Sequence, residues 1–227
     1  MTDIQLHYIE QGQGQPLILL HGNGESCDYF KHQIPFFANQ YRVIAIDTRG
    51  HGKSPRGDKP FTIKQFADDL REFMDAMNLA KAILLGFSDG GNIALTFALK
   101  NPERVEKMIV DGANLFPSGV KPLYQWPIEV GYRIAKLFAN KSTKAKQNAE
   151  MLGLMVNEPH IEPAGLARLV MPVMVVAGTK DMIKESHTRL IYNSLPNAQL
   201  NIIEGDHFVA NKNYEVFNRT VELFLKK

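Results

Sequence analysis

Six short apolar runs recur along the chain, and each has the length of a buried β-strand. Most are apolar at consecutive rather than alternate positions, which is typical of parallel strands covered by helices on both faces. A further segment alternates instead, because polar residues separate Ile4, Leu6 and Tyr8. This alternation predicts an antiparallel strand near one edge of the sheet. The six runs are residues 17–20, 43–46, 82–85, 108–110, 173–176 and 200–203.

Apolar residues recur at helical spacing between several of these runs. The clearest case is 63–78, where the apolar side chains fall on one helix face. Thr62 and Gln65 fit a capping box at the start of this segment. Weaker patterns predict helices over 91–100, 184–194 and 214–225. Strands that alternate with helices indicate an α/β fold with a mainly parallel sheet.

The alternation stops between residues 114 and 168. This stretch contains five prolines, scattered aromatic residues and no strand-like run, and we interpret it as a mostly helical insertion between two strands. Its seven Lys and Arg against four Glu give a net charge of +3, whereas the remaining 19 basic and 20 acidic residues nearly balance. The predicted organisation is a core of residues 1–113 and 169–227 with an inserted segment of 114–168.

Composition excludes several classes of protein. The net charge of +2 gives no electrostatic case for nucleic-acid binding, and one cysteine cannot build a disulfide or a cysteine metal site. No histidine spacing matches a metal site. The apolar runs are too short for a membrane span, and the first residues lack the pattern of a signal peptide. We expect a cytoplasmic protein, and its oligomeric state stays open between monomer and homodimer.

Residues 86–90 read Gly-Phe-Ser-Asp-Gly, which is the pattern G-x-S-x-G. The pattern follows a predicted strand and precedes a predicted helix, the setting of a nucleophile elbow that exposes a serine hydroxyl. A serine is a weak nucleophile without a base, and the base is normally a histidine oriented by a carboxylate. Ser88 is therefore the predicted nucleophile.

The elbow predicts the order serine, acid, histidine along the chain. Among His160, His187 and His207, only His207 directly follows a predicted strand, which places it where open α/β sheets bind their ligands. Asp181 follows the preceding strand and is the predicted acid. Asp111, at the end of the run 108–110, is the alternative.

A tetrahedral intermediate also needs hydrogen-bond donors for its oxyanion. The backbone N–H of Asp89, directly after the nucleophile, is one predicted donor. The second should come from the glycine-containing loop 21–24 after an earlier strand, with the N–H of Asn23 preferred and that of Gly24 as the alternative.

Taken together, these residues resemble the α/β-hydrolase superfamily almost from end to end. The resemblance is carried by the loop 21–24, the segment 47–54, the elbow 86–90, Asp181 and His207. It implies an eight-stranded, mostly parallel sheet flanked by helices, with 114–168 as a short helical cap over the active site. The likeness is greatest to small capped esterases, enol-lactonases and carbon–carbon bond hydrolases. Two departures are a short cap and Asp89 directly after the serine, whose side-chain role the sequence does not explain.

The resemblance implies a cofactor-independent and metal-free serine hydrolase of a small ester or related carbonyl compound, acting through an acyl-enzyme. A serine at the elbow excludes relatives with an aspartate nucleophile, such as haloalkane dehalogenases and epoxide hydrolases. The alternatives are an enol-lactonase or carbon–carbon bond hydrolase with a carboxylate-bearing substrate, an acyltransferase or perhydrolase, and a non-catalytic receptor. The aromatic residues predicted to contact the substrate are Phe116, Tyr124 and Trp126.

Overall fold

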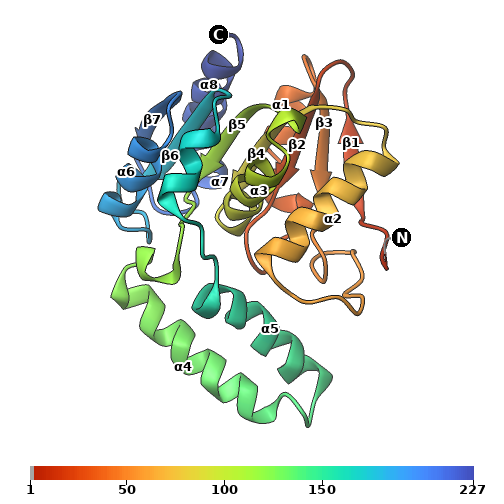
Figure 1. Cartoon of the computed structure of the whole chain (residues 1–227), viewed down its shortest axis with the longest axis vertical. Helices are drawn as coiled ribbons and strands as arrows, with labels where there is room; N and C mark the ends of the chain where they lie inside the picture. Colours follow the sequence, from red (N-terminus) through yellow and green to blue (C-terminus); the bar gives the residue numbers. More distant parts are fainter. Residues whose placement is uncertain (1–2) are drawn as a thin grey trace.

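The computed structural model describes residues 3–227 and contains one seven-stranded sheet in the order β1-β3-β2-β4-β5-β6-β7 (Figure 1). Every neighbouring pair is parallel except β1 with β3. The carboxyl ends of six strands therefore meet at one edge of the sheet. The strands are β1 Tyr8–Gln11, β2 Pro16–Leu20, β3 Arg42–Ile46, β4 Ala82–Phe87, β5 Val105–Asp111, β6 Val173–Gly178 and β7 Ala198–Ile203.

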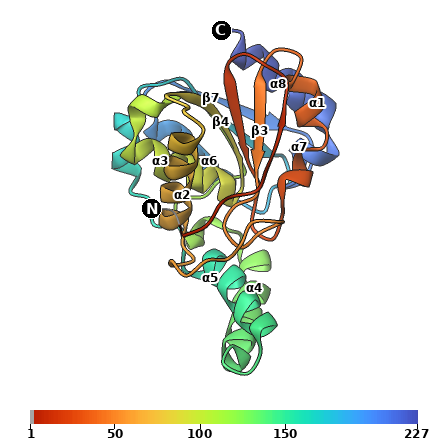
Figure 2. The ribbon, with the colours of Figure 1, turned by 90° about the vertical axis from the view of Figure 1, so that its right-hand side faces the viewer.

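Helices cover both faces of this sheet (Figures 1 and 2). Helices α2, α3 and α6 pack on one face, and α1, α7 and α8 pack on the other. Helices α4 and α5 lie between β5 and β6 in the chain. The bounds are α1 Gln33–Phe37, α2 Ile63–Ala76, α3 Asp89–Lys100, α4 Pro122–Phe138, α5 Thr143–Asn157, α6 Glu185–Ser194, α7 Val209–Lys212 and α8 Tyr214–Leu225.

The consecutive apolar residues of the strands are explained by burial on both sheet faces. In β2, Leu17 and Leu19 pack into the cluster beneath α1 and α8, while Ile18 and Leu20 pack into the cluster beneath α2 and α3. All four side chains are at most 1% exposed. The prediction of a mostly parallel sheet covered on two sides is therefore confirmed.

The amino-terminal edge differs from the expectation in two respects. The antiparallel edge strand exists, but it is Tyr8–Gln11 rather than the segment from Ile4 to Tyr8. Its partner β3 ends at Ile46, opposite Tyr8, so residues 4–7 have no strand beside them. The expected eight strands are wrong, because residues 3–227 contain only seven extended segments that pair in the sheet.

Helix α2 begins at Ile63, directly after Thr62, whose side chain accepts a hydrogen bond from the backbone N–H of Gln65. This is one half of the predicted capping box. The Gln65 side chain does not return to the cap but donates to Asp69, one turn further along. The helix start is therefore as predicted, while the second polar contact serves an ion-pair cluster described below.

Helices α4 and α5 form an antiparallel hairpin that projects from the carboxyl edge of the sheet (Figures 1 and 2). Two contacts join α5 to the core: Arg56 forms an ion pair with Glu150 at 2.7 Å, and Asn23 Nδ2 donates to the carbonyl of Met151. Leu154 is the buried side chain of α5. Among residues 3–227, no helix has both the length and the apolar character that a membrane span requires.

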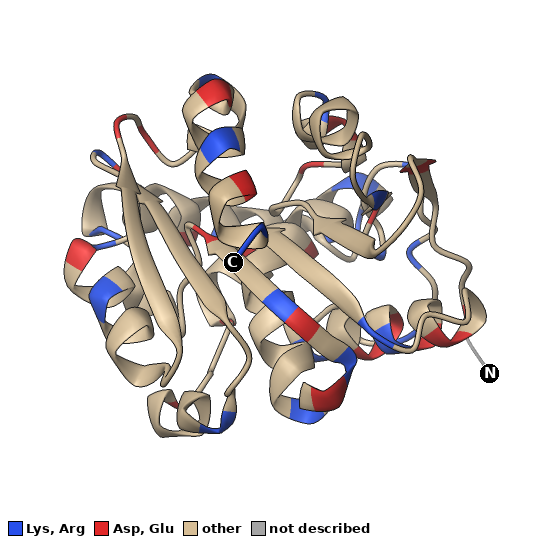
Figure 3. Cartoon of the chain, turned by 90° about the horizontal axis from the view of Figure 1, so that it is seen from above, with Lys and Arg blue, Asp and Glu red and all other residues tan. Residues whose placement is uncertain are grey.

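Charged residues are distributed over the helices and loops at the end of the molecule opposite the hairpin (Figure 3). Both signs are interspersed there, and the strands are largely uncharged. This mixed pattern differs from that of the hairpin, which has the excess positive charge of the chain.

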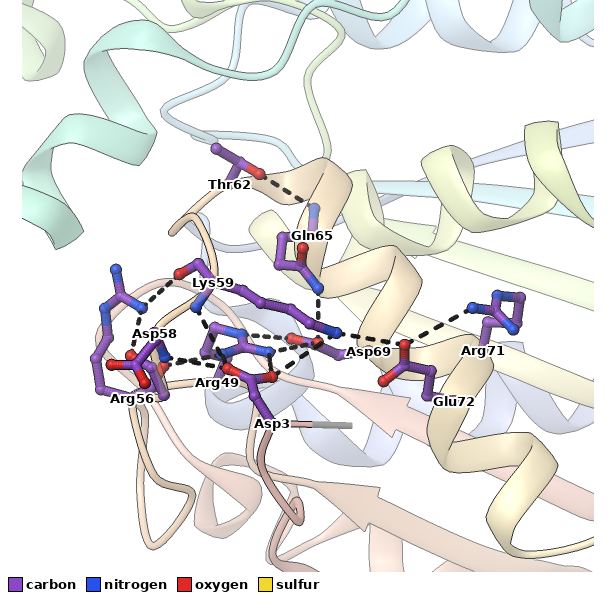
Figure 4. Close-up of polar contacts among 11 residues, drawn as sticks. Asp3, Arg49, Arg56, Asp58, Lys59, Thr62, Gln65, Asp69, Arg71 and Glu72 are labelled. Atoms are coloured by element: carbon purple, nitrogen blue, oxygen red, sulfur yellow. Dashed lines mark hydrogen bonds and ion pairs between the residues drawn. The ribbon is translucent and has the colours of Figure 1, made fainter. Parts of the chain in front are cut away.

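Arg49 is the largest fully buried side chain of the core (Figure 4). Its guanidinium donates to both carboxylate oxygens of Asp69, at 2.7 Å each, and to both oxygens of Asp3. One cation thus joins the amino-terminal segment to α2. Such a buried cluster is sensitive to the loss of one partner, because the remaining charges are then buried without compensation.

We therefore expect Arg49→Ala to lower the free energy of unfolding by about 3–5 kcal/mol, measured by urea denaturation. The matched control is Arg71→Ala, which removes a half-exposed ion pair with Asp75 and should change stability by about 0–1 kcal/mol. Equal losses in the two variants would show that Arg49 contributes nothing through its buried pairing.

Candidate active site

Ser88 occupies the turn between β4 and α3 with φ = 52° and ψ = −119°, a left-handed conformation that L-residues rarely adopt. The turn is possible because glycines surround it. A Cβ atom on Gly90 would lie 1.9 Å from the carbonyl oxygen of Leu20, and one on Gly86 would lie 2.2 Å from the carbonyl oxygen of Gly90. The strand and helix therefore approach closely, and the half-buried Ser88 side chain is presented at the carboxyl edge.

Three side chains from distant parts of the chain meet at this edge. His207 Nε2 lies 3.1 Å from Ser88 Oγ, and His207 Nδ1 lies 2.7 Å from Asp181 Oδ1. Ser88 follows β4, Asp181 follows β6 and His207 follows β7. Both His207 and Asp181 are buried, so water is largely excluded from their contact.

The environment of Asp181 favours its ionised form. Burial acts to raise the pKa of the carboxyl, but the hydrogen bond with His207 and the N–H groups of Ile183 and Gly178 outweigh it, so the pKa is lowered. The Ile183 N–H donates to the same Oδ1 that faces His207, at 2.8 Å. Asp181 is thus a fixed anion placed against one nitrogen of the imidazole.

Asp111, the alternative acid, has the opposite character. It is fully buried at the end of β5, and neither carboxylate oxygen has a hydrogen-bond partner among residues 3–227. Burial, followed by the nearby charge of Asp181, raises its pKa well above the ordinary value. Burial therefore disfavours the ionised form of Asp111, and His207 contacts Asp181 instead.

The loop 21–24 lies beside the elbow because β2 and β4 are neighbours in the sheet. A Cβ atom on Gly22 would lie 3.2 Å from Ser88 Cβ, so the loop passes directly over the serine. Asn23 follows Gly22, and its side chain is bound to the carbonyl of Met151. The N–H of Asp89 is the first of α3 and has no acceptor within the helix. Both predicted oxyanion donors thus belong to segments that border Ser88.

The side chain of Asp89 is buried behind the elbow. Its Oδ1 accepts a hydrogen bond from Asn92 at 3.1 Å, and its Oδ2 has no partner among the described residues. Asn92 also donates to the side chain of Asn114, which joins α3 to the start of the inserted segment. Burial raises the pKa of Asp89 to about 6, despite the opposing hydrogen bond from Asn92.

Two further charged side chains near the site were not predicted from the sequence. Burial raises the pKa of Glu25, and electrostatic attraction to His207 opposes this rise. Lys121, at the start of α4, donates through Nζ to the backbone carbonyl of Asp181. Neither residue belongs to a motif, and only the meeting of separate loops identifies them.

The three aromatic residues predicted to contact substrate are not gathered around Ser88. Phe116 packs edge-on against His187, with the ring centroids 4.8 Å apart. Tyr124 and Trp126 belong to α4 and are exposed, Trp126 to 69%. The rings that contact the histidine of the site belong to Phe87 and Phe208 instead.

One group of potential metal ligands occurs among residues 3–227, formed by His7, Cys27 and Asp47. The Asp47 carboxylate already accepts hydrogen bonds from the backbone N–H groups of Cys27 and Lys53, and it lies 2.8 Å from His7 Nδ1. Both of its oxygens are thus already engaged, and they join the segments of Cys27 and Lys53.

Residues 15–143, more than half of the chain, match the sequence model of a family described as alpha/beta hydrolase fold. The serine hydrolase BPHL of Homo sapiens is 28% identical, over all of this chain and 84% of that protein. The enol-lactonase from Burkholderia xenovorans LB400 superimposes with a TM-score of 0.83 at 20% identity, covering 99% of this chain and 97% of that one. The esterase from Exiguobacterium antarcticum gives a TM-score of 0.83 at 21% identity, with coverages of 99% and 96%. At these identities the two solved structures establish the fold.

The buried Asp89 makes stability depend on pH. Its pKa is about 6 in the folded state and close to 3.8 when unfolded, so the folded protein binds more protons between these values and loses stability as the pH rises. Asp89→Asn removes this loss. We expect the variant to gain roughly 2–3 kcal/mol over the parent protein between pH 4 and pH 7, measured by urea denaturation at each pH.

Asp206→Asn is the matched control, because the hydrogen bond from Lys212 lowers the pKa of Asp206. The stabilisation by this ionised carboxylate develops below about pH 4 and is complete above it, so Asp206→Asn should differ from the parent protein by a nearly constant amount from about pH 5 to pH 7. A constant difference between Asp89→Asn and the parent protein would contradict the raised pKa of Asp89.

Proposed function

This chain belongs to the alpha/beta hydrolase fold family, and we propose that it is a cofactor-independent serine esterase with Ser88, His207 and Asp181 as its catalytic residues. The single observation that carries the proposal is the unbroken series of contacts from Ser88 Oγ through His207 to Asp181 Oδ1. The Ser88 hydroxyl lies 3.1 Å from His207 Nε2, and His207 Nδ1 lies 2.7 Å from the Asp181 carboxylate. This arrangement activates a serine hydroxyl for acyl transfer.

The reaction begins when Ser88 Oγ attacks the carbonyl carbon of the ester. His207 Nε2 removes the hydroxyl proton as the bond forms, and the imidazolium is stabilised by the Asp181 carboxylate at Nδ1. The carbonyl oxygen becomes an oxyanion that accepts hydrogen bonds from the N–H groups of Asn23 and Asp89. Collapse of the intermediate expels the alcohol, which takes its proton from His207 and leaves an acyl-enzyme on Ser88.

Water then completes the cycle. His207 Nε2 removes a proton from water as the oxygen attacks the acyl carbon, and the same two N–H groups stabilise the second oxyanion. The bond to Ser88 Oγ breaks, the serine regains its proton from His207, and the carboxylic acid is released. Apart from the attacking water, the proposed cycle uses only groups of the chain.

The positive charge of the inserted segment is not concentrated at the site. Of the basic residues in 114–168, Lys121 contacts the site, whereas Lys144 and Lys146 are exposed near the start of α5, at the far end of the hairpin (Figure 1). Exposed basic residues at the far end of the hairpin give no support to a carboxylate-bearing lactone or dienoate at Ser88.

We also propose that residues 114–168 serve as the cap of this site. The support is the place of the segment in the chain, between β5 and β6, and its contacts with the rim. Lys121 binds the backbone beside the catalytic acid, and the carbonyl of Met151 holds the side chain of Asn23, the residue of the second oxyanion donor. The inserted segment therefore contacts both the loop of the acid and the loop of the second oxyanion donor.

Replacement of the nucleophile tests the activity directly. We expect Ser88→Ala to lower kcat for p-nitrophenyl acetate by at least about 10⁴-fold and to abolish covalent labelling by a fluorophosphonate probe. The melting temperature should stay nearly unchanged, because the half-buried hydroxyl contacts His207 alone.

The matched control is Ser118→Ala, which removes an exposed hydroxyl in the inserted segment and should keep full activity and labelling. Unchanged turnover in Ser88→Ala would overturn the mechanism. Failure of the probe to label the parent protein would favour a non-catalytic receptor on the same fold.

A pair of isosteric variants tests which acid orients the histidine. Asp181→Asn should lower kcat by about 10⁴-fold with little change in KM, because the imidazolium loses its anionic partner. Asp111→Asn should leave kcat within a few-fold, since His207 is hydrogen-bonded to Asp181 and burial disfavours a charge on Asp111. A larger loss in Asp111→Asn than in Asp181→Asn would reverse the assignment.

A further inference from the structure

Helix α4 exposes a continuous apolar face. Leu123, Trp126 and Leu137 are 80%, 69% and 75% exposed, and no residue of this helix is buried. The spacing of the exposed apolar residues places them along one side of the helix. The full set comprises Leu123, Trp126, Val130, Ile134 and Leu137, called the outer face of α4 below.

The outer face is distinct from the surface with which α4 packs on α5. That inner surface includes Gly131, which approaches Leu152, and Tyr132, which approaches Gly153. A helix that is apolar on two sides normally has a neighbour on both. Here α5 covers one side, and nothing among residues 3–227 covers the other. A large exposed apolar patch of this kind marks an interaction surface.

The charge beside the outer face indicates what covers it. Residues 130–149 contain five basic side chains and no acidic one, and all five are exposed. The surface at the opposite end of the molecule has both signs interspersed (Figure 3). The five residues, called the basic set below, are Arg133, Lys136, Lys141, Lys144 and Lys146.

We propose that the outer face of α4 and the basic set dock on the surface of an anionic lipid bilayer. A helix with a tryptophan and leucines on one side and lysines and arginines beside them lies in the membrane interface, with its apolar face among the acyl chains. The basic set adds attraction to anionic headgroups. The helix lies on the bilayer and does not cross it.

A second copy of the chain is a poorer occupant of this surface. Two molecules joined through their outer faces would bring two basic sets close together, and like charges across an interface oppose association. An anionic bilayer neutralises the same charges. The hairpin projects from the carboxyl edge that holds Ser88, so docking would place the bilayer on the catalytic side of the molecule (Figure 1).

The experiment uses the intrinsic fluorescence of Trp126, the only tryptophan of the chain. Vesicles of phosphatidylcholine with phosphatidylglycerol should shift its emission to shorter wavelength, and brominated acyl chains should quench it. Vesicles of phosphatidylcholine alone should bind far more weakly, and added salt should weaken binding to the anionic vesicles.

Two variants separate the apolar and electrostatic parts while keeping the probe. Lys141→Gln/Lys144→Gln/Lys146→Gln should lower vesicle partitioning by roughly 100-fold, because each basic residue near an anionic surface contributes about 5-fold. Leu123→Ser/Leu137→Ser should lower partitioning and abolish quenching by brominated chains. Leu223→Ser, which removes an exposed leucine of α8 at the other end of the molecule, is the matched control and should bind as the parent protein does.

Ser88→Ala should also bind vesicles normally, so this inference and the proposed esterase activity succeed or fail separately. The proposal is overturned if anionic vesicles leave the emission of Trp126 unchanged, or if both vesicle types bind equally. It is also overturned if the lipid-free protein sediments as a dimer with Trp126 already shielded, because a second copy then occupies the outer face.

Discussion

The close approach of α3 to β2 at the elbow is the constraint on which the candidate site depends. Gly90 lies against the carbonyl of Leu20, and this contact leaves Ser88 in a left-handed conformation that costs about 1–3 kcal/mol. The surrounding parallel sheet supports that strain, because its strands are buried on both faces. The same sheet places the loops after β2, β4, β6 and β7 at one edge, so four separate segments meet around one hydroxyl.

The sheet and the elbow could be predicted because they depend on local patterns. Runs such as 43–46 are apolar at every position only where both faces are covered, and the elbow needs glycine on either side of Ser88. The start of β1 could not be read in the same way, because it depends on where β3 ends. The choice between Asp181 and Asp111 likewise depends on burial and on partners that are distant in sequence. Asp111 is an acid at the correct edge, but burial raises its pKa and disfavours its ionised form.

The exposure and the charge distribution of the inserted segment could not be predicted from the sequence. An apolar helical pattern predicts a buried face, yet α4 has no buried residue. The net charge of +3 describes residues 114–168 as a whole. Within them, Lys121 lies at the rim of the site, whereas the basic set lies further along the hairpin. The arrangement of α4 and α5 in space is therefore needed to distinguish the charge at the rim from the charge of the basic set.

The place where the hairpin leaves the sheet has a consequence for chain entropy. Strands β5 and β6 are hydrogen-bonded neighbours, although the whole inserted segment separates them in the chain. Closing a loop becomes only slowly more unfavourable with its length, by about 0.6 kcal/mol for each doubling. The sheet thus sets almost no limit on how long the segment between β5 and β6 can be. Insertions or deletions there can reshape the hairpin without altering the strands that hold Ser88, Asp181 and His207.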